Sequence, residues 1–233
     1  DELAIDHTVY TVDLLGCGRS DKSSITYTNF VYVQMISDFI KKIIGQKTDV
    51  IASGFSGSFV TMACHNEKEL FNKIMLVNPP SLTQLKQMPN RKDRLLKAAL
   101  EIPIFGTLVY HMIVSRDNIN NLFIEKMYYN PFHVDNQMSD AYYEAAHKGG
   151  YYTRFLYSSL AAKYININIC HALKALDNSI YIVEGETEPN GKAVTDDYCA
   201  SNPAIEVSVL KETKHLPHVE APEAFLEQVK IFF

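Results

Sequence analysis

The fold of this chain is decided by the stretch DVIASGFSGSF, residues 49–59. An apolar run that fits a buried strand leads through glycine and serine into a helical pattern, so the chain turns sharply at Ser56. Such a turn strains the backbone at the serine, and its neighbours must lack bulk, as Gly54, Gly57 and Ser58 do. We therefore expect Ser56 in an unfavourable backbone region at the head of a helix. Glycine and serine also gather in ordinary loops, so this stretch alone leaves the function open.

Two further stretches extend the pattern across the chain. TKHLPHVEAPEAF, residues 213–225, places two histidines just before a helical pattern, and VYTVDLLGCGRSD, residues 9–21, places glycines after an apolar run. Together the three stretches resemble the α/β-hydrolase superfamily. Its catalytic histidine commonly lies in a Gly-His-x-x-His-x-Glu-x-Pro loop, and an early strand runs into an Asp-x-x-Gly-x-Gly-x-Ser turn. The last glycine of the family's Gly-x-Ser-x-Gly elbow is replaced here by Ser58.

The resemblance implies a serine, a histidine and a carboxylate that act together. Ser56 is the expected nucleophile and His215 the expected base, while His218 is expected to be structural. In this chemistry an imidazole takes the serine proton, and a carboxylate fixes the tautomer of the imidazole. The acid follows the family's next strand, here in the Gly-Glu-Thr-Glu-Pro loop. Glu188 is the expected acid there, with Glu186 as its competitor.

The same resemblance implies an oxyanion hole that stabilises negative charge in the transition state. The elbow residues Gly54, Phe55 and Gly57 are expected to shape it, with the N–H of Gly57 as one donor. In the family, the second donor comes from a His-Gly type turn that precedes the segment with which this chain opens. We therefore expect the native chain to begin before Asp1 and to supply that turn.

Apolar strands alternate with amphipathic helical patterns, which indicates a mostly parallel α/β sheet flanked by helices. Strands are expected at residues 8–12, 50–53, 73–78, 180–184 and 206–210. Helices are expected after residue 28, over 59–70 and from Pro222 onward. A core-facing stripe in the first helix is expected from Phe30, Val33, Ile36, Ile40 and Ile43, with Thr28 or Asn29 as N-cap.

Residues 81–177 interrupt this alternation with helical patterns alone. The patterns lie at residues 95–100, 119–127, 138–146 and 155–164, and most of the tyrosines are in this part of the chain. In the family such an insertion is a helical cap over the site. The expected organisation is therefore a hydrolase core of residues 1–80 and 178–233 with a cap of residues 81–177, whose aromatic content indicates an apolar substrate.

The composition of the chain bears on which partners and cofactors it binds. The chain has 233 residues and a net charge of -5 without long charged runs, which gives no reason to expect binding to nucleic acid or a membrane. The remaining histidines lack metal-ligand spacing, so neither a metal nor a cofactor is expected. The separated cysteines, Cys17, Cys64, Cys170 and Cys199, favour a reduced, cytoplasmic protein.

The sequence therefore predicts a serine hydrolase of a small, apolar ester or related acyl substrate, working through an acyl-enzyme. Two alternatives remain open. The fold could serve as a ligand-binding or signalling module without hydrolysis, which the departures at Ser58 and Glu188 and the missing oxyanion turn favour. It could also carry out cofactor-free lyase or peracid chemistry. Haloalkane dehalogenase chemistry is disfavoured, because it needs a carboxylate at the position of Ser56.

Overall fold

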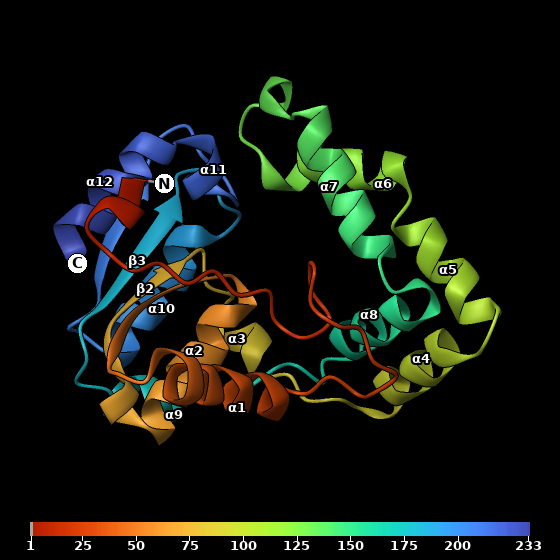
Figure 1. Cartoon of the computed structure of the whole chain (residues 1–233), viewed down its shortest axis with the longest axis horizontal. Helices are drawn as coiled ribbons and strands as arrows, with labels where there is room; N and C mark the ends of the chain where they lie inside the picture. The colour runs from red at the N-terminus through yellow and green to blue at the C-terminus, as the bar shows by residue number, and fades with distance from the viewer. Residues whose placement is uncertain (1) are drawn as a thin grey trace.

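A parallel sheet lies at the centre of the computed structural model, which describes residues 2–233 (Figure 1). Its four strands in these residues are β1 (Thr48–Ser53), β2 (Phe71–Val77), β3 (Ile180–Gly185) and β4 (Glu206–Leu210), which lie in this order across the sheet. All neighbouring strands pair in parallel. Their carboxyl ends therefore meet at one edge, where ligands bind in open α/β sheets. The predicted parallel α/β sheet and four of the predicted strands are confirmed.

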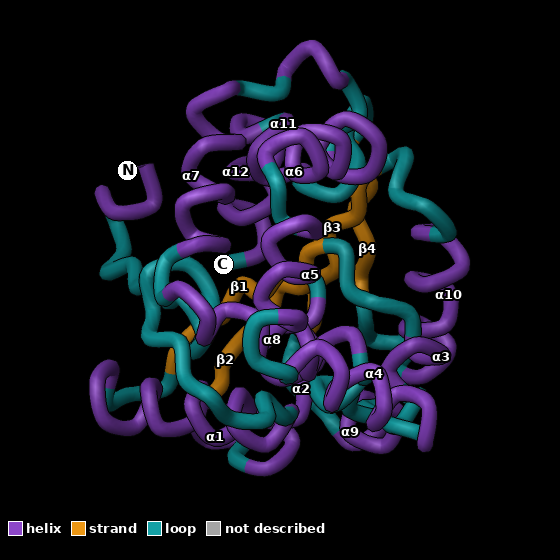
Figure 2. The backbone as a smooth tube through the Cα atoms, turned by 90° about the vertical axis from the view of Figure 1, so that its right-hand side faces the viewer, coloured by secondary structure: helices purple, strands orange, loops and turns teal. Residues whose placement is uncertain are grey.

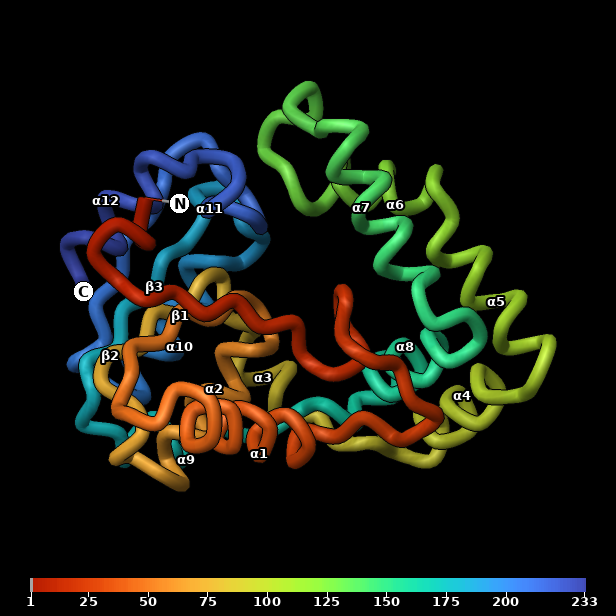
Figure 3. The backbone as a smooth tube through the Cα atoms, viewed as in Figure 1, coloured from red at the N-terminus to blue at the C-terminus, as the bar shows by residue number. Residues whose placement is uncertain are grey.

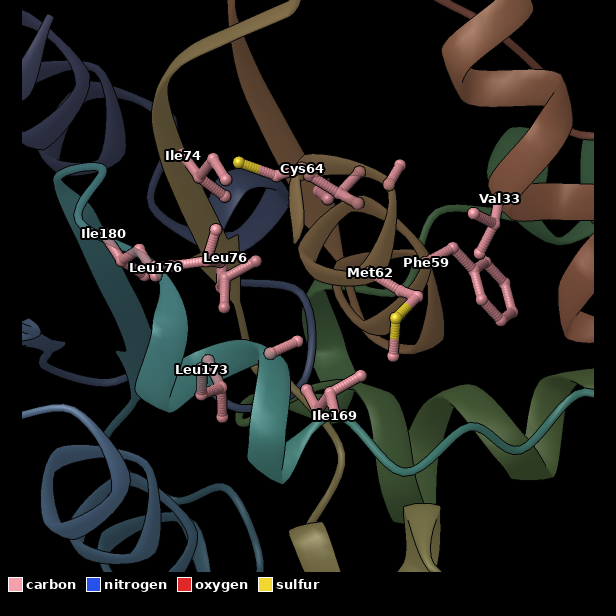
Figure 4. Packing of buried hydrophobic residues seen from close by; sticks show 14 of the residues in the cluster. Val33, Phe59, Met62, Cys64, Ile74, Leu76, Ile169, Leu173, Leu176 and Ile180 are labelled. Carbon is pink, nitrogen blue, oxygen red and sulfur yellow. The ribbon is translucent and has the colours of Figure 1, made fainter. Parts of the chain in front are cut away.

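Alternate residues of the central strands pack on opposite faces of the sheet, as the pleat requires. On one face, Ile74 and Leu76 join a core shared with α1 (Asn29–Phe39), α2 (Phe55–Asn66) and α9 (Cys170–Ala175). Figure 4 shows part of this core, with Phe59 and Met62 of α2 among the labelled side chains. The helix that carries Ser56 is thus anchored directly on the sheet.

The other face of the sheet is covered by the last helix, α12 (Pro222–Phe232). Met75 and Val77 of β2 and Val183 of β3 pack there against Phe225 and Val229. Pro222 occupies the first turn of this helix, as the sequence predicts, because proline is preset for that position and needs no hydrogen-bond acceptor.

Residues 81–177, which we call the cap segment, contain only helices, turns and loops. Figures 1 and 3 show its longer helices forming an arm beside the sheet, and Figure 2 views the molecule from the side of this arm. The helices are α3 (Leu82–Leu85), α4 (Arg91–Glu101), α5 (Phe105–Ile113), α6 (Arg116–Leu122), the π-helical turn η4 (Phe123–Met127), η5 (Pro131–His133), α7 (Asn136–His147), η6 (Gly150–Tyr152), α8 (Thr153–Ala161) and α9. The division of the chain into core and cap stays a prediction.

Five further elements complete the fold of the described residues. They are η1 (Glu2–Ile5), the π-helical turn η2 (Ile40–Ile44) that extends α1, η3 (Lys68–Leu70), α10 (Gly191–Ser201) and α11 (Pro217–Glu220). Within residues 2–233, no single helix has the length and apolar composition needed to cross a membrane, and one bent pair, α4 with α5, meets both conditions only when its two helices are joined.

The predicted strand at residues 8–12 is wrong, because this segment is irregular. A strand needs a hydrogen-bonded neighbour, and this segment forms no ladder with β1, the nearest edge of the sheet. The chain instead runs on toward α8 (Figure 3), where the backbone N–H of Tyr27 donates to the hydroxyl of Ser159 at 3.0 Å.

The predicted core-facing stripe of the first helix, α1, is buried only in the middle of the helix and is exposed at both ends. Val33 and Ile40 are buried, but Phe30 is 80% exposed and Ile43 is also exposed. The helix is rotated so that Tyr32 enters the core, where its ring stacks on Phe59 with centroids 4.8 Å apart. A buried tyrosine hydroxyl needs a hydrogen-bond partner, and the hydroxyl of Tyr32 donates to the carbonyl of Leu15 at 3.0 Å.

Candidate active site

The turn after β1 presents Ser56 at the head of α2. Gly54 has φ 57° and ψ -132°, a conformation that residues with a side chain avoid, and its N–H donates to the carbonyl of Val77 at 2.9 Å. Helix α2 begins at Phe55, so Ser56 lies in its first turn. The expectation of strain at Ser56 is wrong in position, because its φ is not positive. Gly54 absorbs the sharp turn, and the serine is already helical.

The groups of the elbow are hydrogen-bonded to one another. The Ser56 hydroxyl donates to the carbonyl of Ser53 at 2.6 Å, and the N–H of Gly57 donates to the carbonyl of Gly54 at 3.1 Å. The predicted oxyanion donor therefore has an internal partner in this state. Ser58 is fully buried and donates to the carbonyl of Phe55 at 2.7 Å, so it fits the elbow in place of glycine.

The loop after β4 brings His215 to the same edge of the sheet. Its ring Nδ1 lies 3.1 Å from Oε1 of Glu188, in the loop after β3, and both side chains are partly buried. Glu186, the competing acid, instead accepts a hydrogen bond from the backbone N–H of Glu212 at 3.0 Å. The geometry therefore pairs His215 with Glu188.

His218, the other histidine of this loop, lies in a different environment from His215. Its Nδ1 is buried without a hydrogen-bond partner in residues 2–233, and its ring lies against Phe225 with centroids 5.8 Å apart. Burial, with a further contribution from the charge of His215, lowers the pKa of His218. This imidazole therefore favours its neutral form and packs as part of the structure.

The structure brings two of the three expected residues together. His215 and Glu188 are in contact, whereas the hydrogen bonds of the described chain include none between Ser56 and His215. Catalytic hydrogen bonds are often long before substrate binds. In this state the Ser56 hydroxyl is bonded to the Ser53 carbonyl instead.

Sequence reasoning missed Asn78, which follows β2 directly. Its side chain is 5% exposed and its φ is 43°. Its Nδ2 donates to the carbonyls of Lys214 and His215 at 2.8 and 2.9 Å, and its Oδ1 accepts from the N–H of Gly185 at 3.0 Å. An asparagine after a buried strand is a weak signal, because it is also a common turn residue.

Glu220, which belongs to the predicted histidine loop motif, was also given no role. Its Oε1 accepts from the N–H of Lys214 at 2.7 Å, and its Oε2 accepts from the N–H of Tyr129 at 2.6 Å. The N–H of His215 donates to the carbonyl of Met127 at 3.1 Å. The cap segment and the histidine loop are therefore hydrogen-bonded to each other beside the site.

A second carboxylate lies buried behind Glu188. Glu184, the penultimate residue of β3, approaches Gly191 so closely that a Cβ there would overlap its Oε1, and its Oε2 has no partner in the described residues. Burial raises the pKa of Glu184; a Thr195 hydrogen bond opposes this rise, and the charge of Glu188 adds to it. Residues 2–233 contain no cluster of three or more His, Cys, Asp or Glu side chains able to hold a metal ion.

The chain belongs to the alpha/beta hydrolase family, whose sequence pattern matches residues 1–228. Comparison with curated proteins finds no match.

Solved structures share the fold. They include a serine hydrolase involved in carbazole degradation, with a TM-score of 0.74 and 15% identity over 94% of this chain and 76% of the other. The 2-hydroxy-6-oxo-6-phenylhexa-2,4-dienoate hydrolase from Rhodococcus sp. strain RHA1 has a TM-score of 0.71 and 16% identity over 95% and 78%. A bromoperoxidase from Bacillus anthracis has a TM-score of 0.71 and 12% identity over 94% and 79%. At these identities the likeness shows the fold alone.

Proposed function

We propose that this protein is a serine hydrolase that cleaves a small, apolar ester or related acyl substrate through an acyl-enzyme. Membership of the alpha/beta hydrolase family supports hydrolytic activity in general. The observation that carries the proposal is the contact between His215 and Glu188 at the edge of the sheet that also presents Ser56. The three residues act as base, acid and nucleophile.

The contact fixes the direction of proton transfer. With Nδ1–H donating to Glu188, the neutral imidazole of His215 has its free lone pair on Nε2, the atom that accepts the proton of Ser56. The serine oxygen then attacks the substrate carbonyl, and the imidazolium returns the proton to the leaving alcohol. His215 then takes a proton from water in the same way. The attack of this water on the acyl-enzyme releases the carboxylic acid product and regenerates the serine.

The transition state needs donors for the developing negative charge on the substrate oxygen. The N–H of Gly57, at the positive end of α2, is the donor we assign, and it exchanges its bond to Gly54 for one to the oxyanion. One such donor contributes on the order of 3 kcal/mol to transition-state stabilisation.

A ligand-binding protein without hydrolysis is the second candidate. The observation in its favour is that both reactive groups of the elbow, the Ser56 hydroxyl and the Gly57 N–H, already have internal partners. A binding protein keeps such bonds, whereas an enzyme must break them in each turnover.

Labelling with a fluorophosphonate probe separates the two candidates. The wild-type protein should be labelled at Ser56, located by peptide mass mapping, and Ser56→Ala should remove the label. His215→Gln should slow labelling by about a thousandfold or more, since the serine loses its base. His218→Gln is the matched control and should label within a few-fold of wild type.

Lack of labelling of the folded wild-type protein, or labelling at another serine, would overturn the proposal. Nitrophenyl esters graded by acyl length then define the substrate range.

A further inference from the structure

Two consecutive residues, Val77 and Asn78, contact all three loops that carry the proposed triad. The carbonyl of Val77 accepts the N–H of Gly54, which opens the nucleophile turn, at 2.9 Å. The Asn78 side chain accepts the N–H of Gly185, which precedes the acid loop, and donates to the base loop at Lys214 and His215. Bonds to three separate loops thus meet at the end of β2.

This arrangement suits asparagine and few other side chains. The amide offers an acceptor on one atom and two donors on the other, and all three are used while the side chain is 5% exposed. Asparagine also tolerates the left-handed φ of 43° found here. Aspartate has the same shape and keeps the acceptor, but as a carboxylate it donates nothing to the two carbonyls.

The loops have little room to adjust without this contact. A Cβ on Gly185 would overlap the carbonyl oxygen of Lys214, so the acid and base loops already touch through their backbones. One of the two carbonyls that Asn78 binds belongs to His215 itself, so this bond also positions the imidazole. A shift of the order of 1 Å in such a support is enough to cost about a hundredfold in rate.

We propose that Asn78 is the positioning residue of this site, which holds the His215 and Glu188 loops in register with the turn of Ser56. The inference rests on the proposed function and deepens it, because it names the group on which triad alignment depends. Asn78 does not touch the reacting atoms, so its effect passes through the His215 backbone.

Asn202 provides a matched control at the opposite end of the sheet. It is 8% exposed, donates through Nδ2 to the carbonyls of Leu173 and Leu176 at 2.9 and 3.1 Å, and accepts the N–H of Ala204 at 3.0 Å. Its bonds match those of Asn78 in number and type, but they lie before β3 and β4, away from the triad. The two positions therefore separate structural from catalytic consequences.

The test compares Asn78→Asp with Asn202→Asp in the full chain. Both variants place a carboxylate oxygen against two carbonyls, so urea unfolding should show similar losses of stability. Fluorophosphonate labelling of Ser56 should slow by tenfold to a hundredfold in Asn78→Asp and by less than about threefold in Asn202→Asp. Equal slowing in both variants, or no slowing in Asn78→Asp, would overturn the inference.

A second variant and a second readout guard against misfolding and against failure of the proposed function. Asn78→Gly accepts the positive φ without strain and removes all three side-chain bonds, and it should show the same slowing. The NMR signal of the His215 Nδ1 proton needs no activity: both Asn78 variants should shift or broaden it, and Asn202→Asp should leave it in place. If wild type does not label, the proposed function fails. If the wild type labels but the NMR signal is the same in wild type and in both Asn78 variants, the inference about Asn78 fails while the proposed function stands.

Discussion

The loop of Ser56 and the loop of His215 reach the same edge of the sheet by different means. In the serine loop two of the bonds are local, because Ser56 to Ser53 and Gly57 to Gly54 each span three residues, and one bond joins Gly54 to Val77 of the neighbouring strand. In the histidine loop they are distant, since His215 contacts Glu188 across 27 residues and Asn78 across 137. The turn of Ser56 is therefore shaped mostly by its own sequence, whereas the position of His215 depends on the assembled fold.

The largest effect should come from breaking the local loop at Gly54. An alanine there meets free space but must adopt φ 57° and ψ -132°, which costs on the order of 1–3 kcal/mol and moves the serine. We expect Gly54→Ala to slow fluorophosphonate labelling more than a hundredfold. Gly45→Ala is the control, because Gly45 also has a positive φ of 71° and free space but lies after η2. Similar labelling of the two variants would contradict a locally built nucleophile.

An intermediate effect should follow from loosening the distant loop at Glu220. Glutamine keeps one acceptor and loses one of the two carboxylate bonds, to Lys214 or to Tyr129, at a cost of about 1.5–3 kcal/mol. Ester kinetics of Glu220→Gln should show KM rising more than kcat falls, since one link between the cap segment and the histidine loop is weakened while the bond from His215 to Met127 remains. Glu186→Gln is the control, with one bond to a backbone N–H and no recorded hydrogen bond to the cap segment. Unchanged KM in Glu220→Gln would show that the link is dispensable.

The smallest effect should come from Glu184. Its pKa is raised by burial above the ordinary value of 4.5, so its contribution to stability is full below pH 4.5 and is lost as pH rises through the raised pKa. At neutral pH the buried charge is a cost, and Glu184→Gln removes it. Urea unfolding should show a gain within about 1 kcal/mol at pH 7 to 8 that fades toward pH 4. A variant less stable than wild type at pH 8 would exclude this account.

Sequence patterns predicted most of the sheet and the local elbow. Strand β4 matches its predicted bounds, and β1, β2 and β3 shift by only a few residues at their ends, because apolar runs between turn residues determine them locally. The pairing of His215 with Glu188 was anticipated through the family's motif order, and the structure places the two in contact.

What the sequence could not reveal depends on contacts between distant segments. Residues 8–12 have the composition of a strand but no paired neighbour in the described chain. The sequence around Asn78 gives no sign of its hydrogen bonds, since the carbonyls that it binds lie 136 and 137 residues away. The backbone strain predicted at Ser56 is found at Gly54 instead, because the chain turns at the glycine, before the helix that contains the serine begins.

The bond from Ser56 to the Ser53 carbonyl ties up the resting hydroxyl. If this bond contributes the net ~0.5–1.5 kcal/mol typical of a protein hydrogen bond, the hydroxyl is unbonded for about a third to about a fourteenth of the time. Under the proposed mechanism, the rate of attack by Ser56 on a probe or substrate is reduced to that fraction. A substrate that replaces the Ser53 carbonyl as the partner of the hydroxyl would avoid this reduction, so the proposed mechanism favours substrates that contact Ser56 before they react.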